Sequence, residues 1–173
     1  MTSFQDISKF ANMSDYLPIF TGIVIVEFIV LLIFVGHFIK SDTLDVWYHK
    51  YHIFAVVADI LSVFLGIIIA RFLYPYFFSK FSIVLFLLVV VGIQWIHDIL
   101  FYLLFTSVPY GKNKVFDLFK EYAKSAGITA ILGDSSIMIG SVLIASLLAN
   151  LSANANFILL LFFLYCIPYT IFM

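Results

Sequence analysis

The chain has 173 residues, of which 64% are hydrophobic and only 11% charged, and its formal net charge is −1. A soluble domain has about a quarter of its residues charged and about half apolar, so this chain has too little polar surface for a water-soluble globule. A near-neutral charge without a basic block also excludes an electrostatic surface for nucleic acid. The single cysteine, Cys166, cannot form an internal disulfide.

Five apolar segments are long enough to cross a bilayer as helices, which takes about 20 residues. The expected spans are 18–39, 53–74, 81–108, 128–148 and 157–173. Residues 1–17 form a polar N-terminal tail, and 40–52 form a polar connection rich in aromatic residues, which favour the headgroup level. Pro75 is expected to end the second span, and Pro168 to kink or shorten the fifth.

The segment 111–125 predicts a short helix that lies on the membrane surface. Its lysines alternate with Val115, Phe116, Phe119 and Tyr122, and a spacing of three and four gives one apolar face. The chain is therefore expected to form one all-α domain, a polytopic integral membrane helix bundle. It has about five transmembrane helices and one amphipathic interfacial helix.

The distribution of lysine and arginine predicts the orientation of these spans. Lys9, Lys80 and Arg71 fall on one side, and the other side holds Lys40, Lys50, Lys112, Lys114, Lys120 and Lys124. Cytoplasmic loops carry the excess of basic residues, so the N-terminus is expected outside and the C-terminus inside. The segment 150–156 is expected to be an outer turn.

Several ionisable residues lie inside the apolar segments, where a charge is costly unless it is paired or hydrated. Asp59, Asp98 and Asp134 all fall in the inner half of the bilayer on three different helices, so the three carboxylates are expected to meet. Asp59, for example, follows His52 by seven residues, about 10 Å along a helix. Arg71 is expected to extend its side chain to the outer surface, and Glu27 has no evident partner.

On the third span, Gln94, His97, Asp98 and Tyr102 form one polar stripe because they are three or four residues apart. The predicted intramembrane network consists of Asp59, Ser62, Gln94, His97, Asp98, Asp134 and Ser135. One interpretation is a buried network that fixes helix packing, with serines and Gln94 bonding the carboxyls. The alternative is a proton or ion relay in which His97 titrates near neutrality.

A shift of 75 residues aligns the segment Ala55–Asp59 with Ala130–Asp134, and Ala70 with Ala145. A duplicated hairpin, as in transporters with parallel repeats, would explain this alignment. Chance similarity between two apolar helices would explain it equally well.

No enzymatic activity, metal or cofactor is predicted. Asp98 and Asp134 suggest an intramembrane aspartyl protease only as a remote alternative, because His97-Asp98 and Gly133-Asp134 match that family's motifs incompletely. His49 and His52 fit an interfacial aromatic and basic belt better than a metal site.

Four segments carry a resemblance to a known group of proteins: Ala58–Ile60, Ala70–Pro75, His97–Tyr102 and Gly133–Ser136. Together they resemble small multi-pass membrane proteins encoded by giant nucleocytoplasmic large DNA viruses, over about residues 50–169. The resemblance implies a viral protein, in the virion's internal membrane or in a host membrane. It conveys no catalytic role to any residue.

The leading hypothesis from the sequence is a structural or assembly membrane protein whose buried Asp/His network holds the bundle. Its expected partners are the lipid bilayer and either further copies of the chain or other membrane or capsid proteins. The alternative is a small proton- or cation-coupled transporter or channel that uses the same carboxylates.

Overall fold

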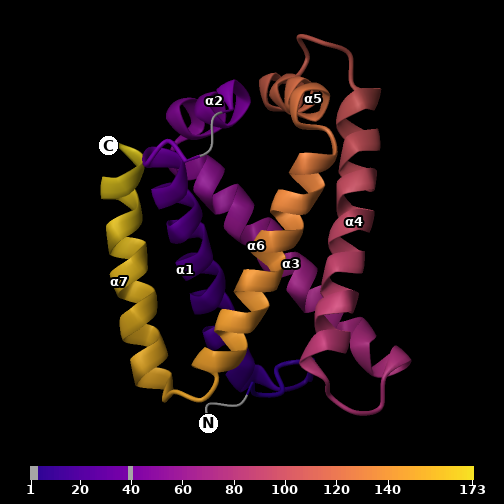
Figure 1. Cartoon of the computed structure of the whole chain (residues 1–173), viewed down its shortest axis with the longest axis vertical. Helices are drawn as coiled ribbons and strands as arrows, with labels where there is room; N and C mark the ends of the chain where they lie inside the picture. Colours follow the sequence, from indigo (N-terminus) through magenta and orange to yellow (C-terminus); the bar gives the residue numbers. More distant parts are fainter. Residues whose placement is uncertain (1–3, 39–40) are drawn as a thin grey trace.

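The computed structural model describes residues 4–38 and 41–173, and within them the chain forms helices and turns but no strand. The long helices are α1 (Tyr16–Val35), α3 (Ile53–Phe77), α4 (Ile83–Ser107), α6 (Ile128–Leu148) and α7 (Ala153–Ile171). All five are long and apolar enough to span a membrane, as predicted. The short helices α2 (Asp42–Tyr51) and α5 (Lys114–Ala126) lie across one end of the bundle (Figure 1).

Several boundaries differ from the expected ones. Helix α3 passes through Pro75, and α7 passes through Pro168. Each proline is in the last turns of its helix, so the missing N–H removes only one hydrogen bond near an end that frays anyway. Asn156 lies inside α7 and not in a turn. Residues 1–3 of the expected tail, the expected span end at Ile39, and Lys40 lie outside the described residues.

The expected polar connection 40–52 is wrong in that most of it is helix α2. The side chain of Ser41 accepts a hydrogen bond from the amide of Leu44, which satisfies one free N–H at the helix start. Acidic residues occupy the first turn and basic residues the last, which complements the helix dipole. The predicted surface helix is present as α5, which Asn113 caps.

The expected polar tail is part of the fold. The backbone of Gln5 donates to the carbonyl of Ser146 at 3.2 Å, and the Ser146 hydroxyl donates to the carbonyl of Gln5 at 2.6 Å. Ile7 is fully buried. Residues 4–12 therefore close the end of the bundle opposite α2 and α5.

Six helices fall into two units with the same order of elements. The first unit is α1, α2 and α3, and the second is α4, α5 and α6; in each, a surface helix joins two long helices. A single residue with positive φ links the surface helix to the next long helix. This residue is His52 (φ 45°, ψ −125°) in the first unit and Gly127 (φ 53°, ψ −129°) in the second. Their numbers differ by 75, the shift found in the sequence.

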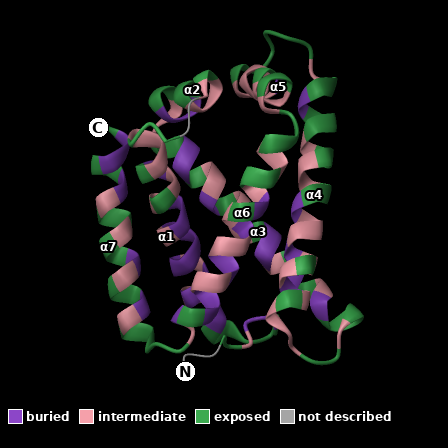
Figure 2. Cartoon of the chain, viewed as in Figure 1, coloured by how far each residue is buried: buried purple, intermediate pink, exposed green. Residues whose placement is uncertain are grey.

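The packing follows the same division. Helix α1 packs on α6 as α4 packs on α3, and within the units α1 packs on α3 as α4 packs on α6. Helices α3 and α6 meet at Gly66, where an added Cβ would lie 2.8 Å from the Met138 methyl. Helix α7 packs on α1. Burial is accordingly densest on α1 and where α3 and α6 cross (Figure 2).

The two interfaces between the units differ in tightness. At α1–α6, a Cβ on Gly22 would lie 2.8 Å from the backbone nitrogen of Ala145, so the two backbones are in close contact. At α3–α4, a hollow of about 410 Å³ opens between Ile69 and Leu73 on one side and Ile93, His97 and neighbouring apolar residues on the other. One interface is closed and its counterpart is open.

Candidate functional site

Glu27 and Asp59 form an acidic pair in the first unit. Helix α2 covers this pair and contributes its donors. The Tyr48 hydroxyl lies 3.4 Å from Glu27 Oε1 and 3.3 Å from Asp59 Oδ2, and Trp47 Nε1 donates to Asp59 Oδ2 at 3.0 Å. Glu27 is buried. The acid that had no evident partner in the sequence therefore shares a donor with Asp59.

The Tyr48 hydroxyl carries only one proton and cannot donate to both carboxyl groups at once. One of the two carboxyls must therefore carry a proton to complete the hydrogen bonds. Burial, followed by the nearby Glu27, raises the pKa of Tyr48 well above its usual value, so the phenol stays a donor. The first unit holds its acids in a closed, hydrogen-bonded arrangement.

Asp98 and Asp134 form the corresponding pair in the second unit. Asp98 Oδ1 accepts from Gln94 Nε2 at 2.7 Å and lies 3.3 Å from His97 Nδ1. Asp98 Oδ2 is buried without a partner among the described residues. In the described chain, no group donates a hydrogen bond to Asp134, although it lies within electrostatic range of Asp98 and His97. The second unit thus leaves carboxylate oxygens open.

Tyr122 on α5 connects the acids of both units. Burial, followed by the charges of Asp134, Asp59 and Asp98, raises the pKa of Tyr122 to about 12. One phenol at the membrane surface therefore faces all three aspartates. The carboxylates lie in one region, as the sequence predicted, but no hydrogen bond joins any two of them in the described chain.

The two serines of the predicted network do not serve the carboxylates. Ser135 donates to the carbonyl of Ile131 at 2.7 Å and accepts from Trp95 Nε1 at 3.0 Å, which ties α4 to α6. Ser62 makes no hydrogen bond within the described residues. A hydroxyl inside a helix commonly bonds the carbonyl four residues back, and for Ser135 this bond takes the place of the expected one.

Arg71 does not reach the surface as expected. Its side chain is fully buried, and Nη2 donates to Asp15 at 3.0 Å and to the carbonyl of Asn12 at 2.9 Å. The guanidinium also lies 4.6 Å from the centre of the Tyr16 ring. The N-terminal segment folds back over Arg71 and supplies these acceptors, so extension into water is unnecessary.

The geometry gives no support to the protease alternative. A protease dyad shares one proton between two adjacent carboxyls, whereas Asp98 bonds Gln94 and His97 and makes no hydrogen bond to Asp134 in the described chain. Among the described residues, no three histidine, cysteine or acidic side chains are arranged to hold a metal ion.

The residues that sequence reasoning missed are the aromatic donors on the surface helices. Trp47 and Tyr122 each lie five residues before the positive-φ turn of their unit, and Asp59 and Asp134 each lie seven residues after it. The shift of 75 residues therefore pairs Trp47 with Tyr122 as it pairs the aspartates. Extending that alignment into 40–52 would have revealed both.

Comparison of the chain with protein-family models, curated proteins and solved structures finds no match. The resemblance to proteins of giant viruses therefore stays a prediction. Five long apolar helices and several buried charged side chains define a class: the chain is a multi-pass integral membrane protein.

Proposed function

We propose that this protein moves protons or a monovalent cation across its membrane through the acidic site between its two units. The observation that carries the proposal is the pair Asp98 and Asp134, whose oxygens keep free acceptor positions at membrane depth. An ionisable group inside a membrane is expensive, so one without a hydrogen-bond partner is by default a functional group. This function involves no enzymatic step.

The neighbouring groups favour a proton as the transported species. His97 adjoins Asp98 at 3.3 Å, and an imidazole changes its charge near physiological pH. Asp134 lies within electrostatic range of both residues. A proton that enters beside Tyr122 thus has a histidine and two carboxylates of one unit available as successive acceptors, with the tyrosine-bridged pair of the other unit nearby.

The proposal includes an orientation for the site. The surface helices α2 and α5 carry most of the lysines, so the end of the bundle that they cover is assigned to the inner side of the membrane. The N-terminus lies at the opposite end and the C-terminus near α2 (Figure 1). This gives an outer N-terminus, an inner C-terminus and an acidic site nearer to the inner face.

The test is proton and potassium flux in liposomes that hold the purified protein. Asp98→Asn and Asp134→Asn are each expected to lower the flux at least about tenfold, because each removes a titrating acceptor. Glu121→Gln on the surface of α5 is the matched control and is expected to leave the flux unchanged. Wild-type liposomes that leak no faster than empty ones, under either gradient, would contradict the proposal.

A second candidate is the structural or assembly role, in a viral or internal membrane, with further copies of the chain or capsid proteins as partners. The closed first pair favours it, because Trp47 and Tyr48 tie α2 to α3 through Asp59. Polar groups bonded in this way hold membrane helices together. Absence of flux, together with loss of assembly in Asp59→Ala, would favour this role over transport.

A further inference from the structure

A hollow of about 370 Å³ lies at the corner where the end of α4 meets α5. Tyr102, Tyr110, Lys120 and Lys124 are among the residues that line it, and these two lysines are its only charged lining residues. Lys120 is only 5% exposed. The hollow is therefore a partly enclosed site of positive charge.

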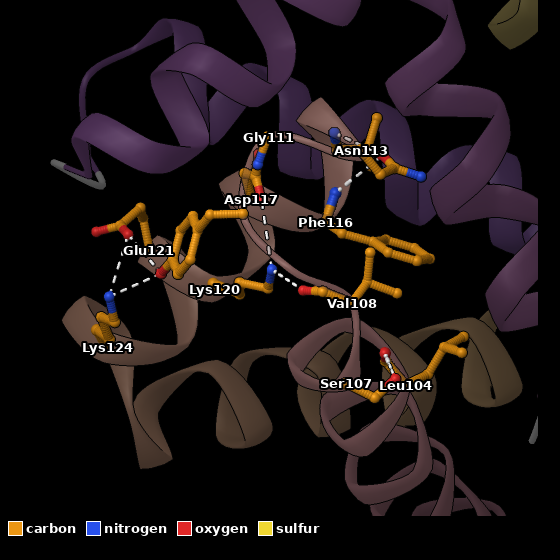
Figure 3. Close-up of polar contacts among 12 residues, drawn as sticks. Leu104, Ser107, Val108, Gly111, Asn113, Phe116, Asp117, Lys120, Glu121 and Lys124 are labelled. Atoms are coloured by element: carbon orange, nitrogen blue, oxygen red, sulfur yellow. Dashed lines mark hydrogen bonds and ion pairs between the residues drawn. The ribbon is translucent and has the colours of Figure 1, made fainter.

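The two ammonium groups are held in place by the protein (Figure 3). Lys120 Nζ donates to the carbonyl of Val108 and to Asp117 at 3.3 Å. Lys124 Nζ donates to the Tyr110 hydroxyl at 2.8 Å and to Glu121 at 3.2 Å. A lysine ammonium has three N–H donors, so each of these lysines retains one for a ligand.

The Tyr110 ring fixes both charges on the same side of the hollow. Lys120 Nζ and Lys124 Nζ lie 4.3 Å and 5.2 Å from the ring centre. Hydrogen bonds to Tyr110 and Glu121 raise the pKa of Lys124, so it keeps its charge at neutral pH. The two cations are therefore arranged to meet one anionic group together.

The hollow extends from the membrane surface towards the hydrocarbon. Tyr102 precedes the last residue of α4 by five positions, which is about 7 Å along the helix axis. Helix α5 itself lies at the end of the bundle, at the level of the lipid headgroups. A ligand that fills the hollow must be polar at one end and apolar at the other, as a phospholipid is.

The first unit shows that the fold does not require these lysines. The shift of 75 residues places Asp45 and His49 at the positions of Lys120 and Lys124. The same arrangement of helices thus forms without two cations at this corner. The lysines of the second unit are available for a purpose other than holding α5.

We propose that the corner between α4 and α5 binds the phosphate of an anionic phospholipid from the leaflet on the α2 and α5 side. Basic pockets between transmembrane helices on the cytoplasmic side are typical sites for such headgroups. Hydrogen bonds between ammonium and phosphate are charge-assisted and hence stronger than neutral ones. This inference is independent of ion transport.

The test is thermal unfolding of the purified full chain in neutral detergent with increasing amounts of short-chain phosphatidylglycerol, phosphatidylcholine or inorganic phosphate. Phosphatidylglycerol is expected to raise the unfolding temperature, and the other two are not. Lys124→Gln is expected to require about fivefold more phosphatidylglycerol for the same shift, as one lysine near an anionic surface would give. Native mass spectrometry provides a second measure of retained lipid.

Lys50→Gln is the matched control, since Lys50 lies on α2 at the same end of the bundle and not in the hollow. It is expected to respond to phosphatidylglycerol as the wild type does. Equal stabilisation by phosphatidylcholine would overturn the proposal. So would equal stabilisation by inorganic phosphate, which indicates a site for free anions, or equal weakening by Lys50→Gln, which indicates general surface charge.

Discussion

The acidic pairs of the two units occupy corresponding places in the fold but have different surroundings. Glu27 and Asp59 lie beneath α2, which supplies a tyrosine hydroxyl and an indole N–H. Asp98 and Asp134 lie near α5, whose Tyr122 makes no hydrogen bond to either of them in the described chain. One arrangement of helices therefore carries a closed acidic pair in one half and an open pair in the other.

The difference comes from a few side chains. Gly22 lies five residues before Glu27 and lets α1 approach α6 closely, whereas Ile93 lies five residues before Asp98 and lines the hollow between α3 and α4. A bulky side chain at that position holds the helices apart. The contrast teaches that the same backbone can fix acids in place or leave them available, according to who supplies the donors and how closely the helices meet.

The largest expected effect concerns the closed interface. Gly22→Ala should destabilise the protein by about 2 to 3 kcal/mol, because the new methyl group meets the backbone of α6 and cannot be accommodated by a side-chain movement. Unfolding in mixed micelles with increasing denaturing detergent measures this loss. Gly92→Ala in α4 is the matched control, since nothing lies within 4 Å of its added Cβ; an equal loss there would contradict the contrast.

The next effect concerns the donors. Tyr48→Phe should destabilise the protein by about 2 kcal/mol, because it leaves two buried carboxyl groups without a shared partner. Tyr122→Phe should change stability by less than about 0.5 kcal/mol, since its hydroxyl bonds no acid. The same unfolding assay compares the two variants. A larger loss in Tyr122→Phe than in Tyr48→Phe would reverse the assignment of closed and open pairs.

A smaller effect is expected at the turns. A non-glycine residue at the φ and ψ of His52 is strained, so His52→Gly should stabilise the protein by about 1 kcal/mol, less what is lost with the His52–Phe172 ring contact. Gly127→Ala should destabilise it by about the same amount, because nothing there relieves the strain. Thermal unfolding in detergent reads both. Changes of the same sign would show that the two turns are not equivalent.

The smallest effect is the pH response of the α5 surface. Hydrogen bonds from Tyr110 and Lys124 lower the pKa of Glu121. Their contribution is therefore present above the ordinary carboxyl value of about 4.3 and is lost as the pH falls through the lower folded-state value. The stability difference between wild type and Glu121→Gln should shrink on going from about pH 7 to about pH 3. A constant difference would contradict it; the first unit has Val46 at this position and no such response.

Much of the fold could be predicted because each long helix is an uninterrupted apolar run, and α6 covers the same residues as the expected fourth span. Helix α2 was missed because its residues are polar and aromatic, although Ser41 and the charges at its ends are ordinary helix signals. Among the site residues, the Gln94–Asp98 contact follows from a spacing of four.

The remaining contacts depend on tertiary folding. Tyr48 reaches Glu27 only because α2 folds back over the end of α1, and Arg71 finds Asp15 only because the N-terminal segment returns across the bundle. Helical periodicity describes one helix at a time and contains no information on such returns. The predicted extension of Arg71 to the surface failed for this reason.

The closure formed by residues 4–12 has a consequence for the order of assembly during synthesis. Gln5 is made among the first residues of the chain, yet its backbone bonds Ser146, which emerges after five of the seven helices. Chains emerge from the ribosome at about 5 to 20 residues per second, so Gln5 waits several seconds for this partner. Arg71 is inserted during that interval, and the segment that covers it can be locked in place only when α6 has arrived.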